Sequence, residues 1–197
     1  MNALKNIKIE LTSKCNQSCV KCPRTILKGT YNEVDISLDH IQTICEAQPE
    51  KIIFMGNLGD PVYHSQFREV IHLTDRYNIP FSVYTSGSGF KKAWWKDIYN
   101  SYNTENGQWF FDIDGTEKTA GTYRVGLSFE ESFTAMSLGA SMNKNITWIF
   151  PVLRHNQNEI QKANDIANEI GIGFRTNFKV SANEQWTWDK NDPWKPI

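Results

Sequence analysis

The sequence lacks the features of membrane, exported and nucleic-acid-binding proteins. No apolar run approaches the ~20 residues needed to cross a bilayer, and the first residues lack the apolar core and cleavage site of a signal peptide. The formal net charge is only -1, so no bulk attraction to nucleic acid or to an anionic membrane is expected. These absences predict a cytoplasmic protein that has neither a membrane nor nucleic acid as its partner.

Cysteine is scarce, and its distribution is uneven. Of the four cysteines, three lie within eight residues, Cys15, Cys19 and Cys22, in the pattern C-x3-C-x2-C. In the absence of an export signal, such a cluster favours metal binding over disulfides. A structural zinc site or an ordinary cubane cluster takes four protein ligands. Cys45 is the one cysteine left, and it lies at an apolar position of an expected helix, where we interpret it as packing.

The rest of the sequence alternates between apolar, β-branched runs and segments of helical periodicity. Six strands are predicted, at residues 7–11, 51–55, 80–85, 109–113, 145–152 and 173–180. Five helices are predicted between them, at residues 37–47, 65–77, 91–102, 128–140 and 158–171. This order favours parallel strands with right-handed crossovers. Since a closed eight-stranded barrel needs roughly 250 residues, the chain predicts an α/β fold of the partial (β/α)6 TIM type, a parallel sheet with outer helices.

We expect one barrel domain over residues 1–180. Beyond it the periodicity ends, and residues 181–197 hold three tryptophans and two prolines in an irregular C-terminal tail. Two interpretations of this tail remain open. It is either an arm that packs its indoles over the barrel or the stub of a longer protein.

The most distinctive residues are expected along one edge of the sheet. Parallel α/β sheets and barrels bind ligands at the carboxyl ends of their strands. These ends carry the cysteine triplet, the GNLGDP stretch at 56–61, the TSGSG stretch at 85–89 and the Asp-Gly pair at 114–115. Each stretch after the triplet also fits an ordinary turn, because Gly, Asn, Asp and Ser are turn formers.

The cysteine triplet directly after the first strand resembles the signature of the radical S-adenosylmethionine (radical SAM) enzymes. In that family three cysteines bind three irons of a [4Fe-4S] cluster, and the fourth iron binds the amino and carboxylate groups of S-adenosylmethionine. The resemblance therefore implies that Cys15, Cys19 and Cys22 ligate such a cluster. It also implies reductive cleavage of S-adenosylmethionine to a 5′-deoxyadenosyl radical, which abstracts hydrogen from a substrate in an oxidoreductase or transferase-like reaction.

A second match is the GNLGDP stretch, which occupies the place of the Gly-Gly-Glu-like motif of the family. Asp60 stands where a glutamate is usual. The resemblance implies that Gly56, Asn57, Gly59 and Asp60 hold the amino end of the cofactor. Glycines suit this role because they let the backbone approach a ligand closely.

A third match is the stretch FDIDGTEKTAGTYRVG at residues 111–126. It resembles a segment of the SPASM/Twitch branch, which modifies peptides and proteins, and it implies that Asp112 and Arg124 contact the ribose or carboxylate of the cofactor. Thr85 lies in a TSG stretch similar to the T-N-G element of the family and is a further implied contact. No cysteine follows Cys45, so the auxiliary clusters of this branch are not expected. Lys21 replaces the aromatic residue that usually precedes the third cysteine.

The resemblance leaves the substrate open between a peptide and a small metabolite. It implies an electron donor such as flavodoxin or ferredoxin. Two alternatives to the enzyme also remain. In the first, the triplet joins Cys45 or a histidine to bind zinc in an interaction module. In the second, a degenerate barrel keeps an iron–sulfur cluster without catalysis and serves as a partner protein.

Overall fold

The strands form one parallel sheet whose spatial order follows their order in the chain. The computed structural model describes residues 5–103, 105–177 and 191–197. Every neighbouring pair of strands is parallel, and β1 and β6 are the edges of the sheet. The strands are β1 (Asn6–Ile9), β2 (Lys51–Phe54), β3 (Phe81–Thr85), β4 (Gly107–Asp112), β5 (Asn145–Pro151) and β6 (Gly173–Asn177). The last three positions of the predicted sixth strand, 178–180, lie outside the described residues.

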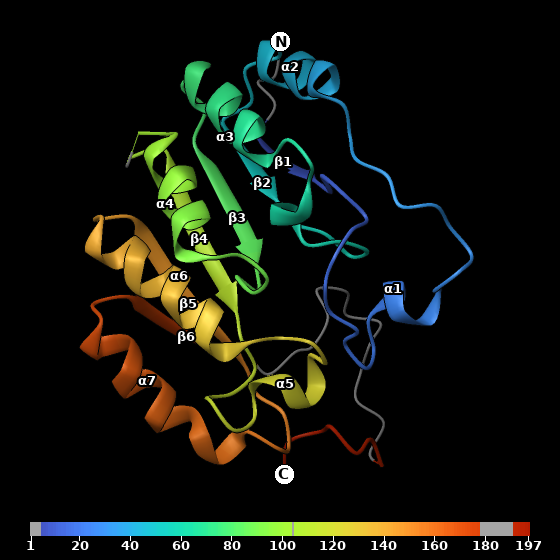
Figure 1. The fold of residues 1–197 in the computed structure, drawn as a ribbon, viewed down its shortest axis with the longest axis vertical. Helices are drawn as coiled ribbons and strands as arrows, with labels where there is room; N and C mark the ends of the chain where they lie inside the picture. The colour runs from blue at the N-terminus through green and yellow to red at the C-terminus, as the bar shows by residue number, and fades with distance from the viewer. Residues whose placement is uncertain (1–4, 104, 178–190) are drawn as a thin grey trace.

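One longer helix connects each strand to the next, and Figure 1 shows these helices gathered along one side of the sheet. They are α2 (Leu38–Glu46), α3 (Phe67–Arg76), α4 (Lys92–Asn100), α6 (Phe129–Ser141) and α7 (Ile160–Glu169). The sequence places two of their starts, because the side chains of Ser37 and Ser128 each accept a hydrogen bond from a backbone amide of the first turn. The predicted partial (β/α)6 barrel is therefore confirmed.

Within the described residues, four short helical segments lie in the connections. They are α1 (Pro23–Ile26), α5 (Ala120–Tyr123) and the 3-10 helices η1 (Pro61–Tyr63) and η2 (Gln157–Glu159). Such segments of three or four residues were not predicted, because they are too short to show a helical period. In Figure 1, α1 and α5 lie on the side to which the carboxyl ends of the strands point.

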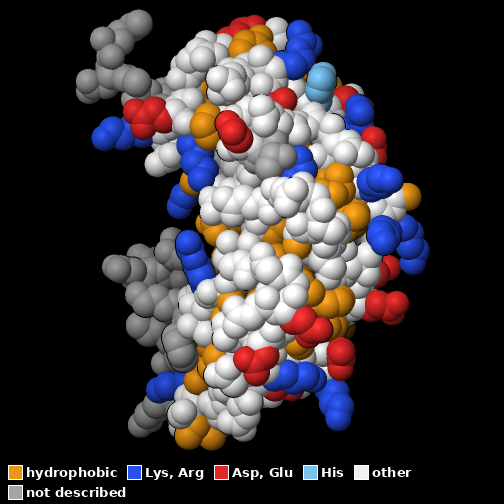
Figure 2. Space-filling model, turned by 90° about the vertical axis from the view of Figure 1, so that its left-hand side faces the viewer, with side chains coloured by type: hydrophobic (Ala, Val, Ile, Leu, Met, Phe, Trp, Pro, Cys, Tyr) orange, Lys and Arg blue, Asp and Glu red, His pale blue; other side chains and the backbone are white. Residues whose placement is uncertain are grey.

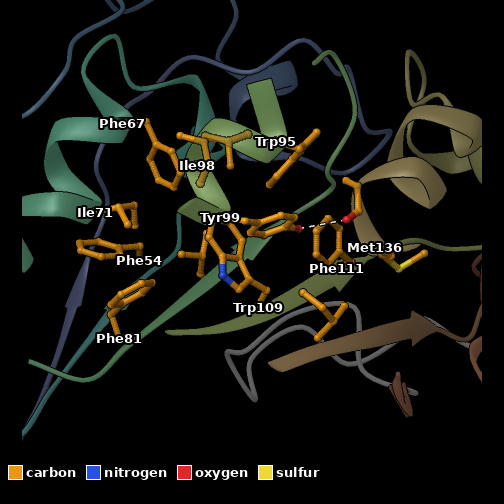
Figure 3. Close-up of a cluster of buried hydrophobic side chains, with 14 of the residues drawn as sticks. Phe54, Phe67, Ile71, Phe81, Trp95, Ile98, Tyr99, Trp109, Phe111 and Met136 are labelled. Atoms are coloured by element: carbon orange, nitrogen blue, oxygen red, sulfur yellow. Dashed lines mark hydrogen bonds between the residues drawn. The ribbon is translucent and has the colours of Figure 1, made fainter. Parts of the chain in front are cut away.

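The main core lies between the sheet and the helices, and it is rich in aromatic residues (Figure 3). Side chains alternate along each strand, so Trp109 and Phe111 of β4 pack against Trp95 and Tyr99 of α4. Tyr99 is fully buried, and its hydroxyl donates a hydrogen bond of 3.1 Å to the backbone oxygen of Ala135 in α6. Each such aromatic side chain contributes roughly 1.5–3 kcal/mol by burial. The core thus fixes the strands from which the loops of the site emerge.

Among the residues that the structure describes, no helix is both long enough and apolar enough to cross a membrane.

Candidate active site at the carboxyl edge of the sheet

The three clustered cysteines lie on the loop that leaves β1, which we call the cysteine loop (residues 13–22). Their thiols are free and half-buried. The backbone amide of Gln17 donates to the Cys15 sulfur at 3.4 Å, and Cys22 is the residue that precedes α1, whose first residue is Pro23. Proline at this position fixes the start of the helix without losing a backbone hydrogen bond.

Two charged residues hold the cysteine loop in place. Asp35 accepts hydrogen bonds from Thr12 at 2.5 Å and from Lys14 at 2.6 Å, and so joins the start of the loop to the segment before α2. Arg24 donates to the backbone oxygens of Ser13 at 3.2 Å and Gln17 at 3.1 Å. These contacts with Asp35 and Arg24 hold the cysteine loop in a defined conformation without a bound metal.

Two thiols of this loop, those of Cys15 and Cys19, have raised pKa values, which favours their protonated form in the metal-free chain. Burial raises the pKa of Cys15 to about 12 and that of Cys19 to about 11; the charge on Arg124 opposes the shift at Cys19. No group of three or more His, Cys, Asp or Glu side chains within the described ranges is arranged to hold a metal ion. A cubane cluster attaches its thiolates to separate irons, so it needs a wider spacing of ligands than one ion does. Three soft thiol ligands on one loop suit that group.

The 56–59 loop, which follows β2, lies against the cysteine loop. The Cys22 sulfur is 3.6 Å from the backbone oxygen of Asn57, and the amide of Asp60 donates to the backbone oxygen of Lys14 at 2.9 Å. A Cβ atom on Gly59 would lie 2.0 Å from the Thr12 carbonyl oxygen. Glycine is thus required here by the close approach of two backbones. The approach of a ligand to this glycine, which the sequence suggests, stays a prediction.

Asp60 binds the end of β3. Its carboxylate accepts hydrogen bonds from the Thr85 hydroxyl at 2.9 Å, the Ser86 amide at 2.8 Å and the Ser86 hydroxyl at 3.1 Å. It also accepts from the Val62 amide at 3.3 Å and so begins η1. Burial raises the pKa of this carboxyl above its ordinary value although these hydrogen bonds oppose the shift. Asp60 and Thr85 therefore fix two loops of the site to each other, and their contact with a cofactor stays a prediction.

Beyond β4, Arg124 lies between acidic side chains and the cysteine loop. Its Nε donates to the carboxylate of Asp114, which is 1% exposed. Both Asp112 and Asp114 raise the pKa of Arg124, and burial raises the pKa of Asp112 to about 6. The Asp112 carboxylate makes no hydrogen bond with a described residue, so it is available to a ligand.

The structure thus brings all the predicted site residues to one edge of the sheet, where Thr85 and Asp112 end β3 and β4 and the others lie on the adjoining loops. Sequence analysis missed Glu10, which accepts hydrogen bonds from the 56–59 loop. Its sequence signal is its place just after a strand, which an ordinary surface charge shares. His155 also follows a strand, β5, and its place there suggests a residue that could touch substrate. In the structure it contacts the backbone oxygen of Asp114 at 3.3 Å, and its contact with substrate stays a prediction.

Cys45 lies apart from the triplet. It is fully buried in the core on α2. In Figure 1, α2 lies at the top of the molecule, apart from α1 at the right-hand side, which directly follows the cysteine loop. The interpretation of Cys45 as a packing residue agrees with this position.

Comparison with solved structures shows a shared fold. Over 98% of this chain, the structure resembles Streptococcus suis SuiB bound to S-adenosylmethionine, with a TM-score of 0.72 and 10% identity. It resembles anSMEcpe with bound AdoMet over 94% of the chain, with a TM-score of 0.66 and 16% identity. It also resembles methylornithine synthase (PylB) over 88% of the chain, with a TM-score of 0.64 and 14% identity. The chain has the fold of these proteins. The resemblance predicted from the sequence is therefore confirmed at the level of the fold.

Sequence comparison gives a shorter match. Over 88 residues the chain is 25% identical to the tungsten-containing aldehyde ferredoxin oxidoreductase cofactor-modifying protein of Pyrococcus furiosus. This match covers 43% of the chain and 24% of that protein. No protein-family model matches the chain. The chain spans 43% of SuiB, 55% of anSMEcpe and 53% of PylB, so it corresponds to about half of each solved structure.

Proposed function

We propose that this chain is the catalytic barrel of a radical SAM enzyme. Cys15, Cys19 and Cys22 hold one [4Fe-4S] cluster, and S-adenosylmethionine binds beside it. The observation that carries this proposal is the position of three free thiols on one loop at the carboxyl edge of a partial barrel, with the Cys22 sulfur 3.6 Å from the backbone of the 56–59 loop. When bound, the cluster and the cofactor supply a 5′-deoxyadenosyl radical by one-electron cleavage of the C5′–S bond, and this radical abstracts hydrogen from the substrate.

The remaining residues of the site bind and orient the cofactor. The 56–59 loop offers backbone carbonyl oxygens to the ammonium group. Arg124 is held by Asp114 through its Nε, so its outer nitrogens remain for the carboxylate, which a guanidinium binds through paired donors. No described residue donates a hydrogen bond to the Asp112 carboxylate, so its oxygens can accept hydrogen bonds from the two ribose hydroxyls. In this arrangement the protein positions the cofactor and shields it from water.

Similarity to solved structures supports the class of substrate. SuiB is described with a bound precursor peptide, and anSMEcpe with bound peptides. These relatives support a peptide as substrate, with a small metabolite as the alternative. An electron donor such as flavodoxin or ferredoxin completes the reaction.

Anaerobic reconstitution with iron and sulfide tests the proposal. We expect about four irons per chain and formation of 5′-deoxyadenosine after reduction in the presence of S-adenosylmethionine. Cys19→Ala should lose both the cluster and the product because it removes one of three ligands. Cys45→Ala is the matched control, since Cys45 is buried in α2, and it should retain iron and product.

Two results would support the alternatives. Colourless protein with one tightly bound zinc per chain would favour the interaction module. A complete cluster that binds S-adenosylmethionine but never cleaves it would favour the degenerate barrel.

A further inference from the structure

Glu10 follows β1 and lies beneath the 56–59 loop. One oxygen of its carboxylate, Oε1, accepts hydrogen bonds from three successive backbone amides: Asn57 at 2.9 Å, Leu58 at 2.5 Å and Gly59 at 3.3 Å. A turn whose successive amides converge on one point is an anion-binding nest. In this chain the anion of the nest is a side chain of the protein itself.

This contact determines which way the peptide groups of the loop face. The amides of residues 57–59 point to Glu10, whereas the Asn57 backbone oxygen lies 3.6 Å from the Cys22 sulfur. At Asn57 the loop therefore presents a carbonyl oxygen, not an N–H, toward the cysteine loop. Carbonyl oxygens attract an ammonium group, whereas amides repel it.

Asp60, the acidic residue that directly follows the 56–59 loop, binds other parts of the site. Asp60 is 7% exposed, and one of its oxygens binds both Thr85 and Ser86 while the other binds Val62. Glu10, by contrast, is exposed, and no described residue donates a hydrogen bond to its second oxygen. Glu10 therefore binds the amides of the 56–59 loop independently of the hydrogen bonds made by Asp60.

We propose that Glu10 is a positioning residue for the cofactor: it turns the amides of the 56–59 loop away from the cysteine loop, so that the Asn57 carbonyl faces the ammonium group of S-adenosylmethionine. This inference rests on the proposed function for its ligand. The orientation of the loop is a property of the chain alone and can be tested separately.

Two measurements on the full chain test the role of Glu10. The first is hydrogen exchange at the amides of residues 57–59 before reconstitution. The second is the affinity of the reconstituted protein for S-adenosylmethionine, together with its iron content. Glu10→Ala should speed hydrogen exchange at the three amides and lower the affinity for S-adenosylmethionine about tenfold, because charge-assisted hydrogen bonds to the loop are lost. The iron content should stay unchanged.

Two further substitutions distinguish positioning from other effects. Glu10→Gln keeps an oxygen that accepts the amides, so it should restore protection and most of the affinity. Glu50→Ala removes an exposed glutamate before β2 and should change neither quantity.

Three outcomes would overturn the inference. Glu10→Ala with unchanged exchange at residues 57–59 would show that Glu10 does not hold the loop. If Glu10→Ala left the affinity for S-adenosylmethionine unchanged, the 56–59 loop would bind the cofactor without the help of Glu10. If Glu10→Gln protects the amides but binds as weakly as Glu10→Ala, the charge acts directly and positioning is wrong. A wild-type chain that binds no S-adenosylmethionine would instead refute the proposed function and this ligand, while hydrogen exchange would still decide the role of Glu10 in the loop.

Discussion

Asp112 is the residue at which binding and stability oppose each other most clearly. It ends β4, and burial raises the pKa of its carboxyl to about 6, although the charge on Arg124 acts in the opposite direction. The folded protein therefore binds a proton at Asp112 more tightly than the unfolded chain does. Such a group lowers stability as pH rises from the unfolded pKa through the folded one.

We expect Asp112→Asn to stabilise the metal-free protein by about 1–3 kcal/mol at pH 7, because the cost of burying the charge is removed. The difference should shrink below pH 6 and vanish near pH 4, where both states of the wild type are protonated. Urea unfolding of both proteins across this pH range measures it. The same variant should bind S-adenosylmethionine more weakly if Asp112 contacts the ribose. A difference that does not depend on pH would contradict the role of the charge.

For single residues, the sequence predicts which side chains lie at the site better than it predicts the contacts that each of them makes there. The place of Asp60 after β2 put it correctly at the carboxyl edge of the sheet. Its bonds to Thr85 and Ser86 depend on how two loops meet in three dimensions, which no local pattern records. Glu10 was missed for the same reason, because its partners are 47 to 49 positions away.

At the scale of elements, Gly59 allows the 56–59 loop to lie against the start of the cysteine loop. A Cβ atom on Gly59 would lie 2.0 Å from the Thr12 carbonyl oxygen and 2.9 Å from that of Lys14. Both obstacles are backbone atoms, so one of the two loops would have to move. Gly121 in α5 offers a matched comparison, because a Cβ atom there would meet its nearest neighbour, the Leu127 carbonyl oxygen, at 3.4 Å.

We therefore expect opposite effects from the same substitution at the two positions. Gly59→Ala should destabilise the protein by about 2–4 kcal/mol and lower its affinity for S-adenosylmethionine. Gly121→Ala should be neutral or stabilise by up to about 1 kcal/mol, since alanine favours helix. Urea denaturation compares the free energies of unfolding. Equal effects at the two positions would show that the close approach of the two loops is not required.

The long elements were predictable because each buries an apolar face with a regular period. Strands such as β4 and β5 differ from their predicted bounds by only a residue or two at either end. The short helices α1 and α5 depend instead on contacts made by the loops. The backbone amide of Val20 in the cysteine loop, for example, donates to the oxygen of Tyr123 at the end of α5.

At the scale of the whole molecule, chemistry and packing are divided between two sides. Figure 2 shows the helix-covered side, where side chains of both signs are interspersed over the surface. The predicted site residues lie instead at the carboxyl edge of the sheet. The sequence predicts this division, because apolar runs define the strands and the unusual residues follow their ends. Of the C-terminal tail, residues 181–190 lie outside the described ranges.

The described part of the tail, residues 191–197, packs across this edge. Asp192 forms an ion pair with Lys21 of the cysteine loop. The Trp194 ring lies 5.1 Å from that of Tyr123 and 5.5 Å from that of His155, between ring centroids. The backbone oxygen of Trp194 accepts from the Arg154 amide at 3.0 Å. The segment thus joins the cysteine loop, α5 and the loop after β5.

A chain that ends at residue 190 should therefore hold its cysteine loop less firmly. We expect Cys19 and Cys22 of the metal-free protein to react several-fold faster with a thiol reagent at fixed pH, because their burial depends partly on these contacts. Mass spectrometry of labelled peptides gives a rate for each cysteine. Cys45 is the internal control, since it is buried in the core and should keep its rate. If only Cys45 became more reactive, the deletion would have loosened the core. If Cys19 and Cys22 reacted at the same rates in the truncated and the full chain, the tail would contact the cysteine loop without restraining it.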